Sequence, residues 1–247
     1  MPDQPKSIRY AIDARVFERF PGYLRAVVLA RDVTNTPSPA ELIELLRAAE
    51  EDARQALAGQ DLSAHPLISA WREAYRALGV KPSEFRPSME AMLRRVLNGH
   101  ELPAINALVD IGNIVSLRCL LPVGGHALDR LEGDVALRPA RGGETYIPFA
   151  NPGDLQMPAE QLPEGEFIFT EGDTVLTRRW TWRQSARIMT TLETAFVGYN
   201  VDILPPATRA GGEQACGEIS ELVTRFCGGR LSTRWLTPEN PMIDLTE

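Results

Sequence analysis

Apolar residues recur along this chain in two different patterns, and the change between them falls near position 120. Before that point they mostly return at every third or fourth position, as on one face of a helix. Beyond it, short runs of β-branched and aromatic residues alternate with Gly and Pro, which is typical of strands joined by turns. The pattern predicts an α+β fold. We expect one compact domain over residues 1–247, with a helical N-terminal half packed on a mixed β-sheet.

Four amphipathic helices are expected in the first half. The first begins at Ser38-Pro39, since Ser can cap a helix, Pro fits its first position and Glu41 completes a capping box. The fourth runs from Pro103 towards Leu117 and carries polar residues inside an otherwise apolar segment. The second and third helices are expected over 67–78 and 89–97, because Gly79 ends the one and Asn98-Gly99 ends the other.

Strands are expected at the N-terminus and through most of the second half. Two apolar runs within 8–33 are split by Pro21-Gly22, which predicts a strand, a turn and a second strand. A last helix is expected over 213–229, followed by an irregular tail from residue 231. The remaining runs predict strands at 134–140, 144–150, 166–172, 174–183 and within 190–204, with a hairpin turn at 171–173.

Charge and cysteine content narrow the possible partners and compartments. The chain has 26 Lys and Arg against 33 Asp and Glu, a net charge of −7, so a nucleic-acid partner needs a local basic face. Three cysteines without metal-ligand spacing indicate free thiols. The chain has neither an apolar run long enough to cross a membrane nor a signal-peptide start, so we expect a cytoplasmic protein without a membrane partner. We predict no protein partner.

Three polar residues share one face of the fourth predicted helix. Asn106, Asp110 and Asn113 are spaced four and then three residues apart, while their neighbours are apolar. One interpretation is a solvated stripe or a set of helix caps and hydrogen bonds to nearby loops. The other is the polar wall of a pocket, because an unpaired amide or carboxylate inside a protein is costly without a ligand or water.

His126 follows two glycines, and this Gly-Gly-His sequence predicts a turn at which a ligand can approach the backbone closely. A histidine there can exchange hydrogen bonds with a substrate near neutral pH. The alternative is a loop histidine that makes a structural bond. Asp129, three residues later, fits a turn or cap better than a catalytic role.

One dense basic run stands out in the second half. Residues 178–183 contain three arginines with tryptophans interleaved and no acid, and Arg187 follows. Arginine matches phosphate geometry and indole can stack on a base, so the run is a candidate RNA-binding face. The alternative is an amphipathic strand with Trp in the core and Arg outside.

Thr191 and Glu193 are two residues apart in a strand-like run, so we expect both side chains on one face, with Glu193 a candidate partner for a cationic group. The alternative is an exposed edge position. The chain has no phosphate-binding glycine loop, no Gly-x-Ser-x-Gly sequence and too few His and Cys for a zinc site. We therefore predict no metal and no cofactor, and we disfavour covalent catalysis.

Several separated motifs, in order, resemble the editing domain of the phenylalanyl-tRNA synthetase beta chain, the B3/4 domain. They are VDIGNIVSL from residue 109, GGHALD from residue 124 and LEGDVALRPARGGE from residue 131, with Leu128 where that family usually has Phe. GEFIFTEGD and RRWTWRQS are similar to freestanding relatives of the domain. The resemblance covers about residues 65–205, and it implies a B3/4-like core there.

The resemblance implies hydrolysis of the ester of a mischarged tRNA by a positioned water, without metal or covalent intermediate. It places His126, Asn113 and Asp110 in catalytic roles. Asn106, Glu193, Thr191 and Asp129 are then expected at the amino acid. The tRNA is expected to contact a basic and aromatic set: Arg178, Arg179, Trp180, Trp182, Arg183 and Arg187.

The run at 179–182 replaces a glycine-rich stretch of the synthetase domain, so the amino acid need not be that of the synthetase. The chain is similar to freestanding deacylases for canavanine attached to arginine tRNA, which makes canavanyl-tRNA(Arg) the leading expected substrate. Two alternatives stay open. One is a deacylase for another misacylated tRNA, such as tyrosyl-tRNA(Phe), and the other is a non-catalytic module that binds tRNA or an amino acid.

Overall fold

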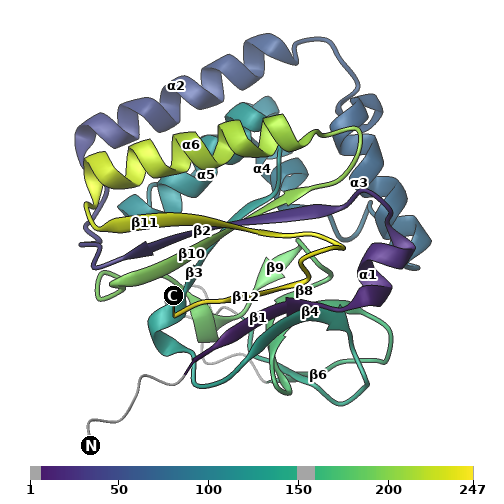
Figure 1. Cartoon of the computed structure of the whole chain (residues 1–247). Helices are drawn as coiled ribbons and strands as arrows, with labels where there is room; N and C mark the ends of the chain where they lie inside the picture. The colour runs from purple at the N-terminus through teal and green to yellow at the C-terminus, as the bar shows by residue number, and fades with distance from the viewer. Residues whose placement is uncertain (1–6, 149–158, 247) are drawn as a thin grey trace, which may run out of the picture.

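A computed structural model of the chain describes residues 7–148 and 159–246. In these residues the chain forms three layers (Figure 1): helices α5 and α6 cover one face of a sheet, with α2 packed against α5, and a second sheet lies against the other face. The predicted α+β class and single compact domain are confirmed. The helices are α1 (Ala14–Arg19), α2 (Ala40–Ala56), α3 (Pro66–Ala77), α4 (Ser88–Leu97), α5 (Ala107–Cys119) and α6 (Arg209–Phe226).

The first sheet has the antiparallel order β11-β2-β10-β3. Its two central strands pair over their whole length, and most of their residues are buried because helices cover one face and the second sheet covers the other. This burial explains why both strands are nearly continuous apolar runs. The strands are β2 (Leu24–Arg31), β3 (Val123–Ala127), β10 (Phe196–Ile203) and β11 (Arg230–Leu236).

The second sheet is mixed and has the order β12-β1-β4-β7-β8-β5-β6, with β9 paired to β8. β1 and β4 run parallel, whereas β7 and β8 form an antiparallel hairpin whose turn contains Gly172 at φ +55°. The predicted turn at 171–173 is confirmed. The strands are β1 (Arg9–Ile12), β4 (Val135–Pro139), β5 (Thr145–Tyr146), β6 (Glu160–Gln161), β7 (Phe167–Glu171), β8 (Thr174–Arg178), β9 (Arg183–Gln184) and β12 (Met242–Asp244).

Several predicted helices are confirmed, but two details near the N-terminus were wrong. The run at 8–20 is not one strand, because Asp13 accepts a hydrogen bond from the amide of Arg15 and so starts α1 directly after β1. Ser38 does not cap α2. Its hydroxyl instead donates to Oδ2 of Asp110 at 2.5 Å, and no side chain caps that helix start.

Four further predictions failed, and in the first two a distant segment decides the conformation. The Gly-Gly-His sequence forms strand β3, because it pairs with β10 along its length. The tail is not irregular, since β11 pairs with all of β2 except its first residue and β12 pairs with β1. The strand predicted at 174–183 stops at Arg178, where two left-handed residues begin a turn. Of the strand predicted at 144–150, only 145–146 is a strand, and 149–150 lie outside the described residues.

None of the described helices is both long and apolar enough to cross a membrane. Among residues 7–148 and 159–246, no group of three or more His, Cys, Asp and Glu side chains is arranged to hold a metal ion.

The helical layer is tied together by a buried carboxylate. Glu50 of α2 is fully buried and accepts hydrogen bonds from the Arg47 guanidinium at 2.7 Å and from the backbone amide of Leu102 at 2.7 Å. Leu102 lies in the segment that leads into α5, so this contact fixes α2 against the start of the helix beside it.

We predict that Glu50→Ala lowers the free energy of unfolding by about 2–3 kcal/mol, because it leaves a buried amide without its acceptor and removes the buried carboxylate that pairs with Arg47. Urea unfolding followed by circular dichroism measures the change. The matched control is Glu51→Ala, which removes an exposed carboxylate one residue away and should leave the midpoint unchanged. Equal midpoints for the two variants would contradict the assignment.

Candidate functional site

A cavity of about 200 Å³ lies between the two sheets and is closed on one side by α4 and α5. It is lined by strands of both sheets: β2, β3 and β10 from the first, and β7, β8 and β9 from the second. Its polar lining residues are Arg25, Ser88, Asn113, His126, Thr177, Thr181, Arg183, Gln184, Asn200 and Asp202.

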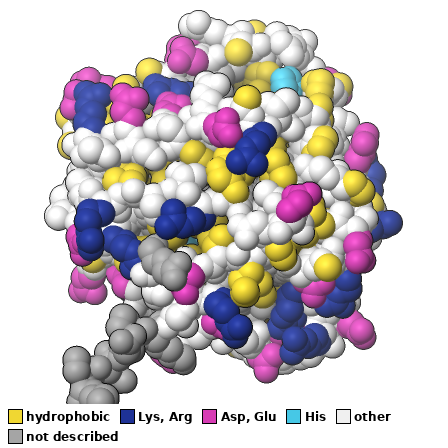
Figure 2. All heavy atoms as spheres, in the orientation of Figure 1, with side chains coloured by type: hydrophobic (Ala, Val, Ile, Leu, Met, Phe, Trp, Pro, Cys, Tyr) yellow, Lys and Arg dark blue, Asp and Glu magenta, His cyan; other side chains and the backbone are white. Residues whose placement is uncertain are grey.

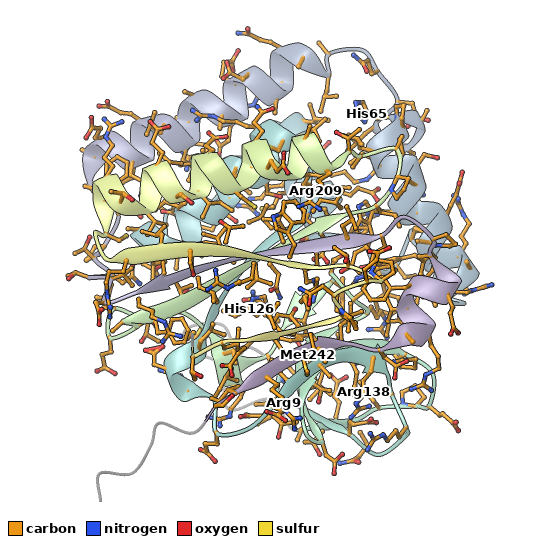
Figure 3. All side chains as sticks on the ribbon, in the orientation of Figure 1. Arg9, His65, His126, Arg138, Arg209 and Met242 are labelled. Atoms are coloured by element: carbon orange, nitrogen blue, oxygen red, sulfur yellow. The ribbon has the colours of Figure 1, made fainter. Side chains whose placement is uncertain are left out.

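His126 projects from β3 into the space between the sheets (Figure 3) and is 4% exposed. Its Nε2 lies 3.3 Å from the hydroxyl of Thr177, and its ring packs edge-on against Phe169. Its Nδ1 has no hydrogen-bond partner of normal geometry among the described residues. Burial, with a smaller contribution from the Arg25 charge, lowers the pKa of His126 to about 4. The imidazole is therefore neutral at physiological pH.

The bottom of the cavity, which we call the floor, holds a buried ion pair. Arg25 of β2 is 1% exposed and Asp202 of β10 is 4% exposed, and the guanidinium lies 2.6 Å from the carboxylate Oδ1. The hydroxyl of Tyr23 donates to the same oxygen, and Arg25 donates to the hydroxyl of Tyr10. Burial disfavours the charge on Arg25, but Asp202 and the two tyrosines outweigh it and raise the pKa of this guanidinium.

The turn at 179–182 forms one wall of the cavity and is held by the N-terminal helices. Tyr75 of α3 donates its hydroxyl to the carbonyl of Arg179 at 2.7 Å, and the amide of Ser88 in α4 donates to the carbonyl of Thr181 at 2.9 Å. Arg179 and Trp180 both have positive φ, at 45° and 63°. These two contacts position the turn and thereby link the helical half to the cavity.

Trp180 does not belong to an exposed stacking surface. It is buried, its indole donates to the hydroxyl of Tyr23 at 3.2 Å, and its ring packs against Trp71 and Phe20. No face of this indole is open to a base. Trp182 is half-buried at the cavity rim and contacts the guanidinium of Arg179.

The basic run does not form one continuous cationic surface. Arg178 is buried and binds both carboxylate oxygens of Glu166, and Arg187 pairs with Glu132 and Glu171. Arg183 is exposed at the rim of the cavity, over the ring of Trp182. Basic and acidic side chains are also mixed across the face drawn in Figure 2.

The polar face predicted on α5 is divided between two functions. Asn106 is the N-cap and accepts from the amide of Val109, while Asp110 is buried and binds Ser38 and the amide of Ile105. Burial raises the pKa of Asp110. These two residues make a helix cap and hydrogen bonds to nearby loops, which is the structural interpretation of this polar face. Asn113 lines the cavity, as the interpretation of a polar pocket wall requires.

Thr191 and Glu193 do not lie in a strand, because residues 190–195 form a turn before β10. The hydroxyl of Thr191 accepts from the amide of Glu193 at 3.3 Å, and the Glu193 side chain is exposed. Asp129 accepts from the amide of Ala195 at 3.1 Å, which anchors the same turn. None of the three lines the cavity, so the structure brings together His126 and Asn113 but not Glu193.

Two of the most buried site residues were not identified from the sequence. Arg25 and Asp202 each lie inside an apolar strand, in LRAVVLAR and FVGYNVDI. A charged residue in such a run is a usable signal, because a charge buried with its strand needs a partner. Thr177 and Asn200 carry no comparable signal.

Comparisons with known proteins bear on the family. The sequence matches the model of the B3/4 domain over residues 70–246. No curated protein matches it significantly. Among solved structures it is similar to an N-terminal fragment of the phenylalanyl-tRNA synthetase beta subunit from Pyrococcus horikoshii, with a TM-score of 0.45 and 10% identity. That alignment covers 92% of this chain and 51% of the fragment, so the chain spans about half the fragment's length.

The family match covers well over half of the chain and includes the α5 helix, the His126 strand and the turn at 179–182. The chain belongs to the B3/4 domain family.

Proposed function

We propose that this protein is a hydrolase that removes the amino acid from mischarged tRNA, with canavanyl-tRNA(Arg) as the leading substrate. The single observation that carries the proposal is the partly open cavity around His126, which polar side chains from both sheets line, in a chain of the B3/4 family. Its volume of about 200 Å³ is below the roughly 300–1,000 Å³ of sites for drug-sized ligands, which suits a small group such as an amino-acid side chain.

An aminoacyl ester is already activated, so the protein mainly has to position a water and stabilise the developing oxyanion. The carbonyl of Gly125 accepts from the Gln184 side chain and so points away from β10. Because the amide and carbonyl of one strand residue point to the same side, the Gly125 amide also faces that open edge. We assign it as the oxyanion donor.

The neutral imidazole of His126 acts as a hydrogen-bonding group here and not as a strong base, since its pKa is about 4. With the hydroxyl of Thr177 and the amide of Asn113 it offers donors and acceptors that hold a water beside the ester carbonyl. A hydroxyl of the terminal ribose can carry protons, because His126, with a pKa of about 4, is too weak a base to activate the Thr177 hydroxyl beside it.

The terminal nucleotide is expected at the rim, where the indole of Trp182 and the exposed guanidinium of Arg183 lie together. Indole offers a stacking surface and Arg a phosphate contact. The tRNA contacts first expected of Arg178, Trp180 and Arg187 do not fit this picture, because the first two are buried and the third is already paired.

Two alternatives are kept. A deacylase for another misacylated tRNA uses the same cavity with a different side chain. A non-catalytic module that binds tRNA or a free amino acid is favoured by the buried, unprotonated histidine, which is a poor base.

We predict that the purified protein hydrolyses canavanyl-tRNA(Arg) within a panel of radiolabelled mischarged tRNAs, and that His126→Gln and Asn113→Ala reduce kcat/KM by roughly 10²-fold. The measurement is the rate at which acid-precipitable radiolabel is lost. His100→Gln is the matched control, because His100 is exposed and lies outside the cavity. Turnover of only another ester would favour the second substrate class, and no turnover of any ester would favour the binding module.

We predict that His126 makes the fold sensitive to acid. In the unfolded chain the imidazole takes a proton below about pH 6.5, whereas in the fold it stays neutral until about pH 4. The unfolded state therefore binds more protons in this window, and stability falls as the pH falls. The expected loss from this residue between pH 7 and pH 4 is about 3 kcal/mol.

The measurement is urea unfolding of wild type and His126→Gln at pH 7, 5.5 and 4.5. As the pH falls, the unfolding free energy of wild type should fall more than that of the variant. A difference that does not change with pH would mean that folding does not shift the pKa of His126.

We predict that Arg183→Gln weakens tRNA binding and lowers the slope of log affinity against log salt by about 1, since one phosphate contact is lost. Filter binding at four salt concentrations measures the slope. Arg187→Gln removes the same charge from the same segment but from a residue that Glu132 and Glu171 already neutralise, so its slope should equal wild type. Equal slopes for all three proteins would remove Arg183 from the RNA face.

A further inference from the structure

The cavity floor is polar but carries no net charge. Arg25 and Asp202 are the charged residues of the floor, and they compensate each other at 2.6 Å. The other charged side chain in the lining is Arg183, which is exposed at the rim. His126 is neutral. A group that reaches the floor therefore finds hydrogen-bonding partners and no unpaired charge to neutralise it.

We propose that the cavity selects amino-acid side chains by their charge: it accepts uncharged side chains that carry hydrogen-bonding groups and rejects permanent cations of the same length. The inference rests on the proposed ester hydrolysis and adds the property that decides which ester is cleaved.

The reason is the cost of taking an ion out of water. A cation that enters the cavity loses its hydration, and only a nearby counter-charge can offset that loss of free energy. The carboxylate of Asp202 is already held by Arg25, and the Arg25 guanidinium beside it repels a second cation. The attraction and the repulsion largely cancel, so the desolvation cost decides the outcome.

An uncharged polar group avoids that cost and finds partners. The contacts of the Asp202 carboxylate with described residues all fall on Oδ1, so Oδ2 is available as an acceptor. The hydroxyl of Thr177 and the amide of Asn200 also line the cavity, and both can donate and accept. A neutral N–H-bearing group can satisfy these partners, whereas an aliphatic group leaves them unpaired.

Three side chains of closely similar length separate charge from shape. Arginine carries a permanent guanidinium cation. Citrulline replaces it with a neutral ureido group. Canavanine carries an oxyguanidine, whose electronegative oxygen lowers its basicity, so that its uncharged fraction grows as the pH rises through the neutral range. The cavity should accept citrullyl esters, reject arginyl esters and accept canavanyl esters in proportion to their uncharged fraction.

Four titratable groups around the floor, Tyr10, Tyr23, Arg25 and His126, keep their protonation states over that pH range. Burial raises the pKa of Tyr10 to about 12 and raises that of Tyr23 well above its usual value. The pKa of His126 is about 4, and that of Arg25 is raised. Tyr10 lies in β1, Tyr23 just before β2, Arg25 in β2 and His126 in β3. Tyr23 and Arg25 contact Asp202 of β10, and Tyr10 contacts Arg25. A change of the canavanyl-to-citrullyl rate ratio with pH then reflects the protonation state of the substrate side chain.

The test compares full-length protein on arginyl, citrullyl and canavanyl esters of one acceptor-stem RNA, from pH 6 to pH 9. We expect kcat/KM for the arginyl ester to be lower than for the citrullyl ester by roughly 10²-fold or more. The canavanyl-to-citrullyl ratio should rise with pH and then level off. This ratio cancels both the intrinsic lability of the ester bond and any titration of the catalytic groups.

Equal rates on arginyl and citrullyl esters, or a canavanyl-to-citrullyl ratio that does not change with pH, would overturn charge selection while leaving ester hydrolysis intact. No hydrolysis of any of the three esters, nor of a wider panel, would instead overturn the proposed function on which the inference rests.

The variant Arg25→Gln tests the floor directly. It leaves Asp202 without its buried counter-ion, so a guanidinium substrate can take that place, and the arginyl-to-citrullyl ratio should rise at least about 10-fold. Arg230→Gln is the control, because it removes the same charge from an exposed pair with Asp32 and should keep the wild-type ratio. A folded Arg25→Gln protein, judged by its thermal melt, with the wild-type ratio would overturn the proposal. If that variant does not fold, the ester series with wild type decides.

Discussion

The contact between Arg25 and Asp202 is the constraint on which the rest of the site depends. It joins the two central strands of one sheet, and through Tyr10 it reaches β1 of the other sheet. Two opposite charges can be buried this deeply only if they are paired and hydrogen-bonded, and Tyr10 and Tyr23 add hydrogen bonds to this pair. The cavity lies beside these polar groups, between the two sheets.

The helical half positions two parts of the cavity wall. Tyr75 and Ser88 hold the turn that forms one wall, and Asn113 enters from α5. The buried carboxylate of Glu50 in turn fixes the segment before α5. Helices from the first half of the chain thus help to set the shape of the site.

Local periodicity was enough to predict the amphipathic helices, the hairpin at Gly172 and the α+β class, because those features depend on neighbouring residues. It failed where a distant partner decides. The glycines before His126 form a strand because β10 lies beside them, and β11 forms because β2 does. Arg25 and Asp202 are 177 residues apart, so neither strand by itself indicates that the two charges meet.

β3, with Gly125 and His126, is one of the two outer strands of its sheet, because only β10 pairs with it. An outer strand normally invites a further strand from another molecule. Here such an addition would occupy the Gly125 backbone that Gln184 now contacts and would block the space in front of His126. Self-association through this edge and an open cavity are therefore mutually exclusive states of the molecule.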